Sequence, residues 1–119
     1  MADEDAWYEN GLAAVERWIR LGDCEMARLD LAAFDLELSG YVRGEERVVF
    51  PAIERMHPAP FAPTARMRRE HGRLRAMLLA VWSALEHGQP WEALEVLGGL
   101  RSVLLLHVAK EDWILRTSA

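Results

Sequence analysis

The chain has 119 residues, of which 51% are apolar, so it is long enough to form one domain, residues 1–119, around its own hydrophobic core. Its one cysteine, Cys24, excludes an internal disulfide and indicates a reducing compartment. The net charge is −5, and the sequence has neither an apolar leader nor an apolar run of roughly 20 residues. We therefore expect a cytoplasmic protein with no membrane partner.

The charge is distributed unevenly along the chain. Residues 1–60 carry 13 acidic and 6 basic side chains, whereas residues 61–119 carry 6 acidic and 8 basic ones. A short basic stretch lies between Arg66 and Arg75. Because the total charge is acidic, this stretch is better explained as a solvated helix face that pairs with acids than as a nucleic-acid site. We expect no nucleic-acid partner.

The first predicted helix runs from about residue 3 to residue 21. Its apolar side chains recur every three or four positions, the period of one helix face. They are Tyr8, Leu12, Val15 and Ile19. Gly22-Asp23 follows, where the glycine can end this helix and the aspartate can cap the next one.

The second predicted helix runs from about Cys24 to Met56 with the same period. The residues on its inner face are Leu31, Phe34, Leu38, Tyr41, Glu45 and Val48. Pro51 should kink the last turns of this helix, because proline has no amide hydrogen to donate. Residues 57–63, which are rich in proline, form the one clear loop.

The third predicted helix begins at the capping residue Thr64 and runs to about His87. The fourth runs from about Trp91 to Leu115, and Pro90 suits its first position. Four helices with short connections predict an all-α fold, an antiparallel up-down-up-down four-helix bundle built from two helical hairpins.

The two halves of the chain resemble each other at an offset of 66 residues. The turn at Gly22 maps onto the turn at Gly88, and the apolar stripes on either side match. Polar residues stand at three matching positions of each copy. In the first copy they are Asp5, Tyr41 and Glu45, and in the second copy they are His71, His107 and Glu111. Residues four apart share a helix face, so all six should converge at one level of the bundle.

Carboxylates and imidazoles are costly to bury together unless they are paired or bound to a metal. Imidazole with carboxylate suits iron, manganese or zinc, so we expect a divalent or trivalent metal ion at this level. Each residue also has a plainer interpretation. His71 and His107 can be hydrogen-bonded core histidines, Tyr41 can fill space and donate to a carboxylate, and Asp5 can favour a helix start. In that case the site holds no metal.

Three stretches of the sequence resemble the hemerythrin-like, or HHE cation-binding, family. They are Glu-Glu-Arg-Val-Val-Phe-Pro at residues 45–51, Arg-Glu-His-Gly-Arg-Leu at residues 69–74, and His107-x-x-x-Glu111-Asp112. The resemblance implies a four-helix bundle with a non-haem di-iron centre. It also implies that Glu45 and Glu111 bridge the metals, and that His71 and His107 bind one of them.

The chain departs from the family at three positions. The family has histidines where this sequence has Asp5 and Tyr41, and its oxygen-carrying members have another where Arg75 stands. We expect Arg75 to add a positive charge beside the site, which would either repel a cation or pair with Glu45 or Glu111. Simple oxygen carriage is therefore not expected.

The sequence favours a metal-binding protein that senses or buffers iron or a small ligand such as oxygen, peroxide or nitric oxide. The alternative is a metal-free bundle that acts as an interaction or dimerisation module, with a second copy or another protein as its partner. The five tryptophans should fill the core, or some of them should form an apolar patch for that partner. No catalytic residue stands out, so enzyme activity, for example with peroxide, stays open.

Overall fold

The computed structural model describes residues 7–56 and 63–118, and every regular element in these two ranges is a helix. The all-α class is confirmed. The helices are α2 (Trp7–Arg20), α3 (Cys24–Gly44), η1 (Glu45–Val49), α4 (Phe50–Met56), α5 (Pro63–Glu86) and α6 (Pro90–Ser118). Within these ranges, none of the helices is both long enough and apolar enough to cross a bilayer.

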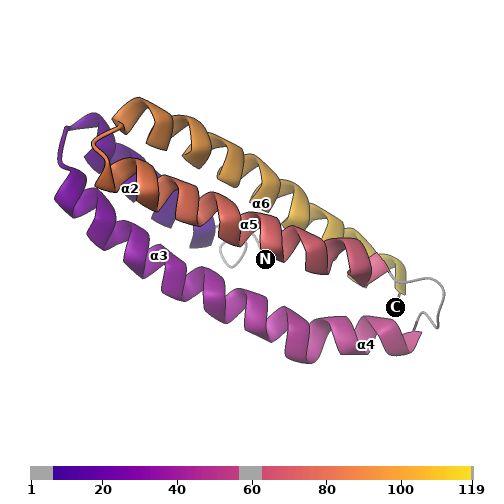
Figure 1. The fold of residues 1–119 in the computed structure, drawn as a ribbon. Coiled ribbons are helices and arrows are strands. Elements are labelled where there is room, and N and C mark those ends of the chain that lie inside the picture. The colour runs from indigo at the N-terminus through magenta and orange to yellow at the C-terminus, as the bar shows by residue number, and fades with distance from the viewer. Residues whose placement is uncertain (1–6, 57–62, 119) are drawn as a thin grey trace.

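The helices pack in two pairs along a common direction (Figure 1). α2 lies against α3 and α5 lies against α6, while α2 also contacts α6 and α3 contacts α5. Each predicted turn joins the two helices within one pair. Gly22 has a φ of 79° and Gly88 a φ of 66°, a conformation that glycine adopts without strain. The Asp23 side chain accepts a hydrogen bond of 3.0 Å from the Met26 amide, so the predicted helix cap is also present.

The second long helix widens just before Pro51. η1 is a π-helix, in which the Phe50 amide donates to the Glu45 carbonyl five residues earlier. Pro51 has no amide hydrogen, and its ring would collide with the carbonyl four residues before it in a regular α-helix. The expected kink takes the form of this wider turn.

The π turn shifts the buried face of the chain by one residue. Buried positions follow the α-helical spacing as far as Glu45, but the next one is Phe50, five residues later. Val48, which regular spacing places on the inner face, is 67% exposed. The prediction for Val48 is wrong because the α-helical period does not continue through this turn.

The buried apolar side chains form two clusters. The larger cluster contains inward residues of α2, α3, α5 and α6 and follows the predicted stripes. The smaller one consists of Phe50, Ile53, Met67 and Ile114. Glu45, His71 and His107 each lie along the chain between residues of the two clusters, so a polar layer separates two apolar regions in the described part of the chain.

The tryptophans do not fill the core as expected. Trp91 is 78% exposed and Trp113 is 62% exposed, while the other three lie half-buried at its margin. Core positions on α6 belong instead to small and aliphatic side chains such as Leu100 and Leu104. Thr64 does not cap α5, because the helix begins one residue earlier; its hydroxyl donates to Glu54 Oε2 at 2.6 Å.

Candidate metal centre

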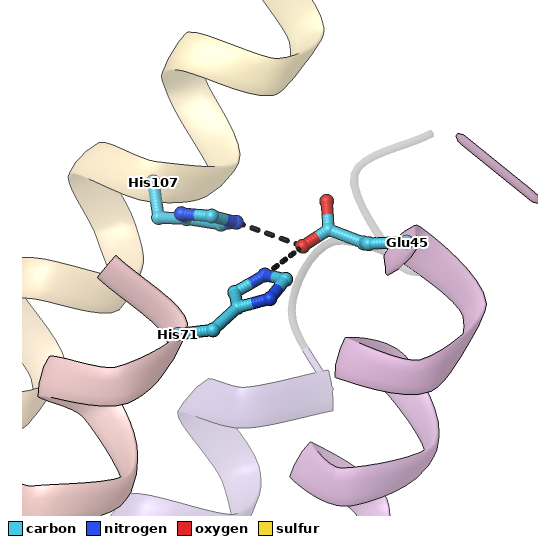
Figure 2. A group of neighbouring side chains, drawn as sticks. All are labelled: Glu45, His71 and His107. Carbon is cyan, nitrogen blue, oxygen red and sulfur yellow. Dashed lines mark hydrogen bonds and ion pairs between the residues drawn. The ribbon is translucent and has the colours of Figure 1, made fainter. Parts of the chain in front are cut away.

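Three buried side chains from three helical segments meet at one carboxylate oxygen. Glu45 projects from η1, His71 from α5 and His107 from α6 (Figure 2). The Nε2 atoms of His71 and His107 lie 2.7 Å and 2.8 Å from the same atom, Glu45 Oε1. The three offer ligand atoms within 4.8 Å of one another, and they are the only such group found among the described residues. The predicted convergence of these three residues is observed.

Helical spacing explains why both histidines point inward. His71 follows the buried Met67 by four residues and precedes the buried Leu74 by three. His107 follows the buried Leu104 by three residues. Each imidazole therefore occupies a position that an aliphatic side chain would otherwise take, and its polar atoms need partners within the core.

Two further carboxylates lie behind the histidines. His71 Nδ1 is 2.8 Å from Glu46 Oε2, and His107 Nδ1 is 2.8 Å from Glu70 Oε1. Lys110 donates to the other oxygen of Glu70 at 2.6 Å. An ionised carboxylate only accepts hydrogen bonds, so an imidazole that faces a carboxylate at each nitrogen is satisfied when both nitrogens carry protons.

These contacts shift the pKa values of the inner groups. Burial alone would raise the pKa of Glu45, but hydrogen bonds from His107 and His71 and their charges lower it below its usual 4.5. Burial alone would lower the pKa of His71, but its hydrogen bonds to Glu45 and Glu46, with their negative charges, raise it above its usual 6.5. The ion pair between Glu45 and His71 is therefore held in its charged form.

The second oxygen of Glu45 has no hydrogen-bond partner. Glu45 is 2% exposed, and its Oε2 finds no donor among the described residues. A buried carboxylate oxygen without a partner is costly, and a cation is one way to satisfy it. Two imidazole nitrogens with this carboxylate are a ligand set that iron, manganese and zinc accept. The residues present therefore fit a metal ion.

Tyr41 and Glu111 form a separate pair beside this group. The Tyr41 hydroxyl donates to Glu111 Oε2 at 2.7 Å, and its ring packs edge-on against His107 with the centroids 6.1 Å apart. Glu111 does not belong to the group whose ligand atoms converge. Asp5 lies outside the described residues. Tyr41, Glu111 and Asp5 stay predictions as ligands.

Arg75 does not make the predicted contact with the site. Its side chain is exposed, while Glu45 is contacted by the two histidines and Glu111 by Tyr41. Arg75 follows the buried Leu74 by one residue, so its side chain points about 100° away from that of Leu74 and out of the core. The prediction of a fixed positive charge paired with a bridging carboxylate is wrong.

Neither helical periodicity nor the family resemblance predicts a role for Glu46, Glu70 or Lys110. The first two stand next to Glu45 and His71 in the sequence, which was the available signal. Glu46 contacts His71 and Glu70 contacts His107, in each case on the neighbouring helix, so only the packing of the helices reveals these pairs.

The fold and the site define a helical protein with a buried carboxylate–imidazole centre. The sequence matches the family described as "Hemerythrin HHE cation binding domain" over residues 11–117. The chain belongs to this family. A comparison with curated proteins and one with solved structures give no match.

Proposed function

We propose that the chain binds a transition-metal ion through Glu45, His71 and His107. The observation that carries the proposal is the buried Glu45 Oε2, which lacks a partner beside two converging imidazoles. In the metal-loaded protein, each Nε2 would offer its lone pair inward, and each Nδ1–H would donate outward to a carboxylate. The family to which the chain belongs supports a cation at this place.

The formal charges of the cluster favour a divalent ion. With both imidazoles protonated, the cluster carries three positive and three negative charges. Its members are Glu45, Glu46, Glu70, His71, His107 and Lys110. A divalent ion that replaces the two protons on the inner nitrogens leaves the net charge at zero. Binding of a divalent ion therefore adds no net charge to the buried cluster, so it avoids the cost of burying an uncompensated charge.

The physiological role that we propose is sensing or buffering of iron, or of a small ligand such as oxygen, peroxide or nitric oxide. Manganese and zinc suit the same ligands. A metal held here would supply a Lewis-acidic or redox-active centre for such a ligand. We propose that residues 1–119 act as one cytoplasmic domain, an up-down-up-down bundle of two helical hairpins.

The second half of the family's centre is altered in this chain. The Tyr41 hydroxyl already donates to Glu111, the carboxylate that the resemblance assigns as a second bridge. Asp5 and Tyr41 stand where the resemblance implies neutral imidazoles, so a second ion would lack two nitrogen ligands of the family's set. We propose one firmly held ion, or two held unequally, and no reversible oxygen carriage.

The competing function is a metal-free interaction module. One observation favours it: with both imidazoles protonated, every ring nitrogen of the site already has a carboxylate partner. The balanced ion pairs would then serve only to join the helices.

Metal uptake separates the two functions. We expect the purified protein to take up about one equivalent of zinc or ferrous iron, and the double variant His71→Ala/His107→Ala to lose tight binding. Elemental analysis after gel filtration measures the uptake, and circular dichroism checks that the variant keeps its helices. Equal metal content in both proteins would exclude this site and favour the interaction module.

A further inference from the structure

We propose that Glu46 and Glu70 are positioning residues that aim the two imidazoles at the centre, and that Lys110 adjusts the second of them. This inference rests on the proposed metal binding and explains what prepares the histidines for it. Glu46 and Glu70 lie behind the rings of His71 and His107 and reach the nitrogens that face away from Glu45.

The two outer contacts repeat one arrangement on successive helices. Glu46, next to Glu45 on η1, reaches across to His71 on α5. Glu70, next to His71 on α5, reaches across to His107 on α6. Adjacent helix residues point about 100° apart, so when one faces the centre its neighbour faces the adjoining helix. η1 and α5 thus each supply one inner ligand and one support for a histidine of the next helix.

A carboxylate at Nδ1 decides which nitrogen is free to bind a metal. A neutral imidazole carries its single proton on either nitrogen, and only the other one has a lone pair to donate. An acceptor fixed at Nδ1 keeps the proton there and leaves Nε2 unprotonated. The hydrogen bond also prevents the ring from flipping, so the lone pair points toward Glu45.

Packing holds the two rings as well, but it does not select the nitrogen. The Phe50 ring stacks on His71 at 5.2 Å with an angle of 17° between the planes, and the Tyr41 ring meets His107 edge-on. Such contacts do not distinguish this ring orientation from one turned by 180°, in which Cδ2 and Cε1 would take the places of Nδ1 and Nε2, and they do not fix which nitrogen carries the proton. Glu46 and Glu70 fix both, because each supplies an acceptor at Nδ1.

The two supporting carboxylates differ in their charged neighbours, because only Glu70 is also paired with a lysine. The Glu46 side chain is 39% exposed, and within the described ranges its one ion pair is with His71. The Glu70 side chain is 16% exposed and is shared between His107 and Lys110. A negative charge at Nδ1 strengthens an imidazole as a ligand, and a cation beside that charge weakens the effect. Lys110 should therefore make His107 the weaker donor of the two.

Zinc affinity in four single variants tests the roles. Glu46→Ala and Glu70→Ala should each weaken zinc binding about 10–100-fold, the usual effect of losing such a partner. Lys110→Met removes the same ion pair as Glu70→Ala but keeps the carboxylate behind His107, so it should bind zinc more tightly than wild type. Glu54→Ala is the matched control: it breaks contacts with Thr64 and Arg68 between α4 and α5 and contacts neither His71 nor His107, so zinc affinity should not change.

Competition with a chromogenic chelator measures the four affinities. Nitrogen-15 spectra of the zinc-loaded proteins add a readout that a purely structural role would not move. Wild type should show zinc on Nε2 and a proton on Nδ1 of both histidines, whereas Glu70→Ala should show a mixture for His107 alone. Glu70→Gln, whose amide oxygen still accepts a hydrogen bond, should restore the single form.

The outcomes separate this inference from the proposed function. Wild-type protein that binds no zinc overturns both. Wild type that binds zinc while Glu46→Ala and Glu70→Ala bind it equally well overturns the positioning role alone. A Lys110→Met variant that loses as much affinity as Glu70→Ala shows that the ion pair acts only as a link between helices.

Discussion

Replacing Glu45 by glutamine removes the buried charge at the centre while preserving the size of the side chain. Glu45 is 2% exposed, and its Oε1 accepts hydrogen bonds from both imidazoles. Breaking a buried ion pair by removing one partner costs about 3–5 kcal/mol, because the other charge stays buried without compensation. We expect a loss of this size in the unfolding free energy of the metal-free protein between pH 4.5 and pH 6.5.

The pH dependence of that loss identifies its cause. The pKa of Glu45 is lowered below 4.5, so its stabilising contribution is present above pH 4.5 and is lost as the pH falls through the lowered value. The pKa of His71 is raised above 6.5, so its contribution is present below pH 6.5 and is lost as the pH rises through the raised value. The difference between wild type and Glu45→Gln should therefore shrink toward alkaline pH.

Urea unfolding in the presence of a chelator, followed by circular dichroism, measures the difference. Glu9→Gln is the control, because Glu9 pairs with Arg101 on the exposed surface, where water screens the charges, and its loss should be much smaller. A loss below about 1 kcal/mol for Glu45→Gln, or one that is the same at every pH, would refute the reasoning.

Three further predictions concern the metal-loaded protein. Zinc affinity should rise with pH, whereas the contribution of His71 to the stability of the metal-free protein falls. The reason is that zinc must displace the proton from His71, whose pKa is raised. Calorimetric titrations at several pH values measure the affinity, and a constant affinity would contradict the prediction. The iron-loaded protein should lack a visible phenolate band, because the Tyr41 hydroxyl donates to Glu111; a band that Tyr41→Phe abolishes would make Tyr41 a ligand. In air the reduced, iron-loaded protein should oxidise once without cycling, and several clean optical cycles of oxygenation would count against a single firmly held ion.

Much of the fold followed from helical periodicity. The apolar stripes of α2 and α5 are buried as predicted, because each helix has one face that the core can cover. The turns at Gly22 and Gly88 followed from residue chemistry, since both positions need a positive φ. The same periodicity placed Glu45, His71 and His107 on inner faces, which is why their meeting could be anticipated.

The remaining features depend on contacts between segments. The wider turn before Pro51 changes the register by one residue, so Val48 faces outward although the local pattern places it inward. Comparison with the family predicted a positive charge from Arg75 beside the metal site, but the Arg75 side chain is exposed to solvent. The pairing of Glu46 and Glu70 with histidines on other helices has no local pattern at all.

The polar layer divides the core into two units of unequal strength. The larger apolar cluster joins four helices, whereas the smaller one has only four buried members and lies at the end where α4 contacts α5 and α6. A unit with so little buried area opens without global unfolding, so backbone amides of α4 should exchange hydrogen for deuterium faster than those in the middle of α3. Such local opening would admit an ion to a centre that is otherwise closed to solvent, and the opening rate of this end would then limit how fast metal enters and leaves.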